Sequence, residues 1–167
     1  MPPSSTSRDG VAKGAYVLEE ADDADLTVIG VGAELNIAVD AAAMIREEQK
    51  LKVRVVSFPC QRIFDKQPKS YQRDVLRRHK GIPAVVVEAY ASYGWARYAD
   101  AAVCMSTDRY GQSLPGSINY DYFGFNPKSI MAKVEKYFAD LKSGEVLKGE
   151  FMELATKREH GEVGAGH

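Results

Sequence analysis

The chain has 167 residues, of which 45% are hydrophobic and 27% are charged, and its formal net charge is −1. This length suits one folded domain with a sizeable core, and the composition is not that of a disordered or collagen-like chain. No apolar run approaches the roughly 18 residues of a membrane-spanning helix, so no membrane partner is expected. The polar residues 1–12 and the charged, Gly-rich residues 155–167 are predicted to be flexible tails of a domain at 13–154.

Short apolar segments alternate with amphipathic ones along this domain. Segments rich in apolar and β-branched residues predict strands at 15–20, 25–32, 52–58, 83–89 and 100–106. Apolar residues spaced three and four apart predict helices at 34–49 and 126–144, the second with Asn126 as its N-cap. The alternation of strands and helices predicts right-handed crossovers and a mostly parallel sheet, and therefore an α/β fold.

The charges are distributed unevenly. Residues 46–80 carry eleven basic and four acidic side chains, whereas residues 1–45 carry two basic and eight acidic ones. A basic region of this kind can bind phosphate, nucleic acid or an acidic partner. Lys and Arg also flank strands and helix ends in ordinary α/β proteins, and no aromatic platform for RNA accompanies them, so no nucleic-acid partner is expected.

The two cysteines, Cys60 and Cys104, are predicted to be free thiols, because they lie far apart in the sequence and form no C-x-x-C motif. Cys60 follows a predicted strand, where α/β proteins often place catalytic groups. A cysteine nucleophile needs a base, and the histidines lie in a hydrophilic turn (His79) and in the predicted tail. A packing thiol is therefore the favoured interpretation, with a nucleophile as the alternative.

Glycines in the segment "GVGAEL", residues 30–35, stand where a strand turns into a helix. Backbone amides can hold phosphate at such a turn, and an effector site for a phosphate or nucleotide would also use the basic region. The third glycine of a dinucleotide fingerprint is absent, and Glu34 opposes an anion. Glycines that permit a tight turn are the favoured interpretation.

An aromatic segment, "EAYASYGWARYAD", follows the strand predicted at 83–89. Glu88 is a candidate general base or an acceptor for amides of the next turn. Aromatic residues this dense either form an interface or pocket, or pack a short helix on the sheet, and both interpretations remain open. The interface or pocket candidates are the aromatic residues Tyr90, Tyr93, Trp95 and Tyr98, together with Asp108, Arg109 and Tyr110 of the loop that follows the last predicted strand.

Several ordered motifs resemble the C-terminal domain of transketolases: "GAYVLEEADDADLTVIGVGAELNIAVDAA", "KVRVVSFPCQRIFDKQPKSYQRDVL", "IPAVVVEAYASYGWARYA" and "DRYGQSLPGSINYDYFGFNPKSI". The wording "VVSFPCQRIFD" is most similar to the fungal dihydroxyacetone synthases, or formaldehyde transketolases. The resemblance implies a three-layer α/β sandwich with a mostly parallel five-stranded sheet. It also implies that thiamine diphosphate and magnesium belong to the two preceding domains of the family and not to this chain. No catalytic residue of the family falls on this sequence.

Three functions are compatible with these residues. The leading hypothesis is a transketolase C-terminal module without its own ketol-transfer activity, which acts through a homodimer or through a partner chain that carries the other two domains. The second is an independent enzyme with a pocket at the carboxyl edge of the sheet, formed by Glu88, Tyr93, Tyr90, Trp95 and Cys60. The third is the phosphate effector site. The chain ends Ala165-Gly166-His167 and not in a peroxisomal tripeptide, so a cytoplasmic location is expected.

Overall fold

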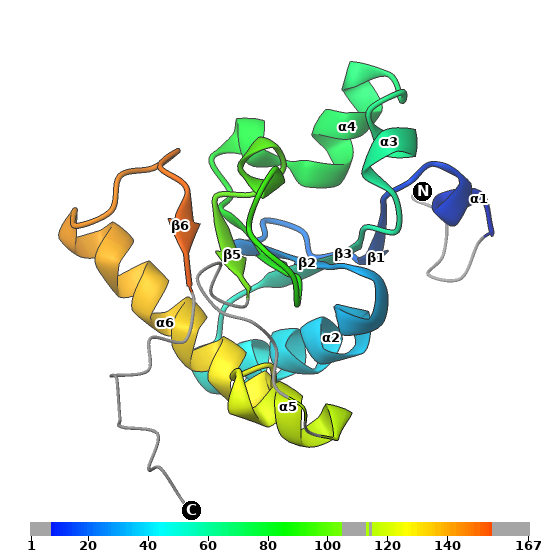
Figure 1. The fold of residues 1–167 in the computed structure, drawn as a ribbon. Coiled ribbons are helices and arrows are strands. Elements are labelled where there is room, and N and C mark those ends of the chain that lie inside the picture. Colours follow the sequence, from blue (N-terminus) through cyan, green and yellow to red (C-terminus); the bar gives the residue numbers. More distant parts are fainter. Residues whose placement is uncertain (1–7, 105–112, 114, 155–167) are drawn as a thin grey trace, which may run out of the picture.

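One six-stranded sheet forms the centre of the molecule in the computed structural model, which describes residues 8–104, 113 and 115–154 (Figure 1). The strand order is β1-β3-β2-β4-β5-β6. β1 runs antiparallel to β3, and all other neighbours are parallel. The strands are β1 (Tyr16–Glu19), β2 (Leu26–Gly30), β3 (Val53–Ser57), β4 (Ala84–Val87), β5 (Ala101–Val103) and β6 (Met152–Glu153).

Helices cover both faces of this sheet, so the fold is the predicted three-layer α/β sandwich (Figure 1). α2 and α6 lie on one face, and α3 and α4 lie on the other. The helices are α1 (Arg8–Ala12), α2 (Leu35–Met44), which continues into a π-helical turn (Ile45–Gln49), α3 (Gln61–Phe64), α4 (Lys69–Leu76), α5 (Gly116–Tyr122) and α6 (Pro127–Ser143). Short 3-10 turns occupy Gly32–Glu34, Arg78–Lys80 and Trp95–Arg97.

The two faces of the sheet have separate hydrophobic cores because successive strand residues point to opposite sides. On β2, Val28 packs in the α2/α6 core, whereas its neighbour Ile29 packs in the α3/α4 core. The predicted N-cap of α6 is confirmed, since the Asn126 side chain accepts a hydrogen bond from the Ser129 amide at 2.9 Å.

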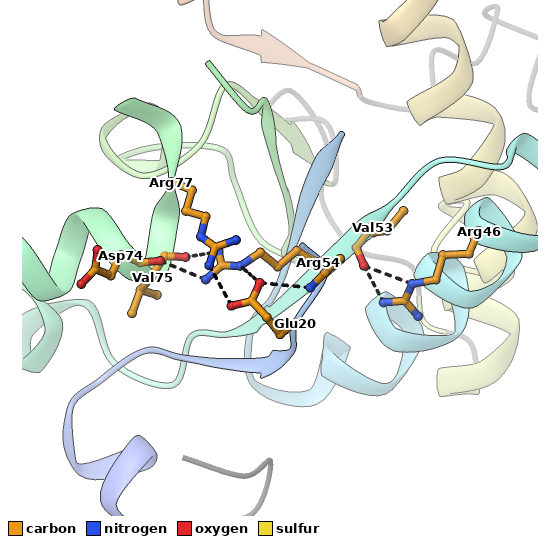
Figure 2. A network of polar contacts seen from close by, with 8 residues as sticks. Glu20, Arg46, Val53, Arg54, Asp74, Val75 and Arg77 are labelled. Carbon is orange, nitrogen blue, oxygen red and sulfur yellow. Dashed lines mark hydrogen bonds and ion pairs between the residues drawn. The ribbon is translucent and has the colours of Figure 1, made fainter. Parts of the chain in front are cut away.

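A buried arginine connects β3 to the α3/α4 face (Figure 2). Arg54 donates to Glu20 at 2.7 Å and to the carbonyl oxygens of Val75 and Asp74, which lie in the last turn of α4. Arg77 binds the second oxygen of Glu20 at 3.1 Å. Burial lowers the pKa of Arg54, and the Glu20 carboxylate opposes that shift. Arg54 therefore links β3 to the last turn of α4 and to Glu20, the residue that follows β1.

The structure differs from the sequence analysis at two places. A sixth strand, β6, pairs with β5, and its two residues are too few to give a periodic signal in the sequence. Residues Arg8–Ala12, which were expected in the N-terminal tail, form α1, where Gly10 is buried against Tyr16. The expected tail at 155–167 lies outside the described residues. Among the described helices, none is both long and apolar enough to cross a membrane.

Candidate functional site at the carboxyl edge of the sheet

The carboxyl ends of β2 and β4 form the position at which this type of fold is expected to bind a ligand. The chain leaves β2 through α2 toward β3, whereas it leaves β4 in the opposite direction toward β5. Connections that diverge in this way open a crevice between the two strands, and ligands of open α/β sheets bind in such crevices. Glu34 follows β2 and Glu88 follows β4, so the crevice has a carboxylate on each side.

A cavity of about 460 Å³ lies at this edge. Its volume is within the range of small-molecule pockets, roughly 300–1,000 Å³. The lining residues come from the ends of β2, β3 and β4: Val31, Phe58, Pro59, Cys60, Gln61, Glu88, Tyr90, Ala91, Tyr93 and Trp95. The structure thus brings together the five residues that the sequence analysis grouped in a carboxyl-edge pocket.

Glu88 accepts a hydrogen bond from the Tyr90 amide at 3.1 Å, which fixes the turn after β4. Burial raises the pKa of the Glu88 carboxyl, and the nearby Glu34 adds to the rise, while amide hydrogen bonds from Tyr90 and Ala89 oppose it. Glu34 is itself buried and accepts a 2.5 Å hydrogen bond from the Tyr120 hydroxyl of α5. Both sequence-based roles of Glu88, amide acceptor and acid or base, are compatible with this geometry.

The aromatic segment after β4 divides into exposed and buried members. Tyr90 and Tyr93 are 82% and 79% exposed. Trp95 is buried and packs edge-on against Phe58, although one side of it lines the cavity. Tyr98, expected at an interface or pocket, is buried in the core, where burial and the hydrogen bond to Asp65 raise its pKa to about 12. The 3-10 turn Trp95–Arg97, which is followed directly by Tyr98, places the side chains of Trp95 and Tyr98 in the core on the sheet.

Cys60 lines the cavity and is the N-cap residue of α3, and its backbone amide donates to the Gly14 carbonyl at 2.9 Å. No histidine lines the cavity in the described part of the chain, and His79 lies in the turn that leads into the opposite end of β4. Cys104 is fully buried at the end of β5, and burial raises the pKa of its thiol to about 11.

The two thiols are expected to react very differently. At pH 8 the half-buried Cys60 should be labelled by an aromatic disulfide reagent in the native protein, whereas the buried, protonated Cys104 should react only after unfolding. Absorbance of the released thiolate counts one thiol in buffer and both in denaturing guanidinium chloride. The Cys60→Ser variant is the control, and equal native rates for both thiols would show that the burial of Cys104 is wrong.

The glycine turn after β2 has a packing role. A Cβ atom on Gly30 would lie 2.8 Å from the Leu35 Cα and 3.0 Å from the Ala38 Cβ, so Gly30 lets α2 approach the sheet. The carboxylates of Glu34 and Glu88 lie at this edge, and no Lys, Arg or His lines the cavity among the described residues. These groups disfavour an anion, so the geometry does not favour the phosphate effector hypothesis.

Sequence reasoning missed the bond between Tyr120 and Glu34 and the place of Gln61 on the cavity wall. No local signal could reveal the first, because the partners are 86 residues apart. Asp108, Arg109 and Tyr110, also expected at the site, lie outside the described residues. The described residues contain no group of three or more His, Cys, Asp or Glu side chains placed to hold a metal ion.

Fold and site together define an α/β domain with a pocket at its topological switch point. The chain belongs to the transketolase C-terminal domain family: the family model described as "Transketolase-like TK C-terminal domain" matches residues 14–126. It is similar to dihydroxyacetone synthases, with 48% identity over 95% of the chain to the Candida boidinii protein and 41% over 96% to that of Pichia angusta. This confirms the resemblance noted in "VVSFPCQRIFD".

The relatives are much longer than this chain. The match covers 22% of each of the two dihydroxyacetone synthases, so the chain spans about a fifth of their length. A transketolase from Pichia stipitis, in complex with sedoheptulose 7-phosphate, superposes with a TM-score of 0.77 and 32% identity over 84% of this chain and 20% of its own. A solved structure described as "Split gene transketolase, inactive beta4 tetramer" has a TM-score of 0.60. It is 21% identical over 81% of this chain and 46% of its own, and it shows the shared fold.

Proposed function

We propose that this chain is the C-terminal module of a transketolase-type enzyme of the dihydroxyacetone synthase branch, and that it contributes assembly rather than ketol transfer. The observation that carries the proposal is the coverage: 95% of the chain aligns with the Candida boidinii enzyme, but with only 22% of that enzyme. The module would act with the remaining domains, whether these belong to a separate chain or to the same one. Homodimer contacts are the second mode of assembly that we propose.

The carboxyl-edge cavity, within the described residues, is poorly suited to the diphosphate group of the family's cofactor. Thiamine diphosphate with magnesium needs oxygen ligands for the metal and donors for the diphosphate. The carboxyl-edge cavity has Glu88 in its wall and Glu34 nearby, and within the described residues its wall contains no cationic side chain. Two carboxylates repel a diphosphate, so the proposal assigns no thiamine chemistry to this pocket.

Split assembly is consistent with a relative of the same fold. One solved structure carries the description "split gene transketolase", so this fold also occurs in an enzyme whose parts are encoded separately. The exposed Tyr90 and Tyr93 are suited to contact another domain, because tyrosine supplies a large contact area with few rotatable bonds.

Reconstitution tests the proposal. The part of the Candida boidinii dihydroxyacetone synthase that precedes its match to this chain is purified and assayed for ketol transfer from xylulose 5-phosphate to formaldehyde, with thiamine diphosphate and magnesium. We expect no activity from this chain alone and an increase of at least about tenfold when it is added to the fragment, since assembly completes the enzyme. Activity of this chain alone, or an unchanged rate of the fragment, would contradict the proposal. Leu147→Ala, an exposed change on the loop after α6, should reconstitute as well as the wild type.

The alternative, an independent enzyme, is favoured by one observation: Glu88, with its raised pKa, shares a cavity with Cys60 and two tyrosines. A half-buried carboxylate of this kind suits proton abstraction next to a carbonyl group. In a separate experiment in deuterated water, this chain alone would then exchange the α-protons of dihydroxyacetone, and Glu88→Gln would abolish the exchange. Absence of exchange in the wild type removes this alternative.

A further inference from the structure

Two carboxylates at the carboxyl edge have no cationic partner in the described part of the chain. Glu34 and Glu88 take part in none of the ion pairs found there, although Glu34 is buried and Glu88 is half-buried. Other partly buried acidic groups of the molecule are paired, as Glu20 is with Arg54 and Asp100 is with Arg78. Buried or half-buried carboxylates are normally paired, so this edge is complementary to a positive charge.

Aromatic side chains stand beside these carboxylates. Tyr90, Tyr93 and Trp95 all line the cavity with Glu88, and the two tyrosines extend into solvent from its rim. Aromatic faces attract cations, and a planar guanidinium stacks on them better than an ammonium group because it is more weakly hydrated. Gln61, which follows β3 and also lines the cavity, adds an amide oxygen that can accept a hydrogen bond.

The chain passes beside this cavity at the point where the family match begins. The family match begins at residue 14, and Gly14 accepts a hydrogen bond from the amide of Cys60, a cavity residue. A Cβ atom on Gly14 would lie 2.4 Å from the Phe64 amide nitrogen, so the start of the domain is closely packed on α3. The segment that enters the domain therefore runs beside the pocket, which puts the pocket within reach of the preceding domain.

We propose that the carboxyl-edge pocket receives an arginine side chain of the thiamine-binding part of the enzyme, held by Glu88 and stacked between Tyr90 and Tyr93. This inference rests on the proposed function, because the arginine belongs to the partner domain. The guanidinium would displace water from Glu88 and supply a positive charge that the described residues do not place beside the two carboxylates. The pocket is in this way an assembly contact and not an anion site.

A small probe tests the pocket without the partner. Nα-acetyl-arginine methylamide is titrated into the ¹⁵N-labelled chain, and amide shifts are followed by NMR. We expect saturable shifts confined to residues 88–95 and 60–61, with a dissociation constant in the millimolar range. The isosteric, uncharged Nα-acetyl-citrulline methylamide should give no saturable shifts. Equal shifts with citrulline, shifts centred elsewhere, or no shifts would overturn the inference.

Variants locate the contact. Glu88→Gln should weaken arginine binding about tenfold, and Tyr93→Ala, at a largely exposed position where folding is little affected, should weaken it at least threefold. Glu135→Gln, an exposed change on α6, is the matched control and should bind like the wild type. Unchanged binding in both pocket variants would overturn the inference.

The two proposals fail separately. Arginine binding without reconstitution of ketol transfer would refute the module function and leave the cation pocket standing. Reconstitution without arginine binding, or reconstitution unaffected by Tyr93→Ala, would refute the pocket and leave the module function standing.

Discussion

Replacement of Glu20 by glutamine is expected to lower the free energy of unfolding by about 3–5 kcal/mol, because the buried Arg54 guanidinium loses its only carboxylate partner among the described residues. The Arg54 side chain is 1% exposed, and its remaining bonds go to the neutral carbonyl oxygens of Val75 and Asp74. Glutamine keeps the shape and one oxygen acceptor but not the charge. Urea denaturation followed by circular dichroism measures the difference.

Glu19→Gln is the matched control, since Glu19 is the neighbouring residue and also pairs with an arginine. That pair, with Arg46, has side chains that are 36% and 34% exposed, so its loss should cost about 0–1 kcal/mol. If the two variants have the same stability, the buried network of Figure 2 does not contribute as described.

Gly14→Ala is expected to destabilise the protein by about 2–5 kcal/mol, through a strained backbone and a steric clash. Gly14 has φ of +84°, and an added Cβ would lie 2.4 Å from the Phe64 nitrogen and 2.5 Å from the Cys60 oxygen. Both neighbours are backbone atoms that cannot move without shifting α3. Denaturation curves report the stability, and the reactivity of the Cys60 thiol reports the displaced cavity wall.

Gly81→Ala separates the two causes. Gly81 has φ of +74°, but nothing lies within 4 Å of an added Cβ, so only the backbone cost of about 1–2 kcal/mol applies. Equal losses for the two variants would mean that the close approach of residue 14 to α3 is absent.

The framework of the fold could be predicted from the sequence because its signals are local. The run Val53–Ser57 is buried on both faces, and its apolar character alone indicates a central strand. Asn126 marks the start of α6 by its capping chemistry, and this prediction is confirmed. Gly144, the last residue of the predicted helix, has the left-handed backbone conformation of a C-cap. A family-specific sequence motif, "VVSFPCQRIFD", identified the domain.

Long-range and very short features could not be predicted. β6 has two residues and exists only because β5 offers a free edge. Arg54 lies in an apolar strand, and nothing near it in the sequence reveals that the end of α4 and Glu20 surround it. For the site, sequence reasoning grouped the cavity residues by the topology rule, but it could not tell that Tyr98 is buried while Tyr93 is exposed. That difference depends on how the Trp95–Arg97 turn packs on the sheet.

Direct association tests the module function most sharply. Sedimentation velocity is run on this chain, on the part of the Candida boidinii enzyme that precedes its match to this chain, and on their mixture at micromolar concentration. We predict that the mixture sediments as a larger complex with equal numbers of both polypeptides, and that Tyr93→Ala reduces its population while Leu147→Ala does not. Independent sedimentation of the two polypeptides, with no complex at any ratio, would contradict the assignment of this chain as a transketolase assembly module.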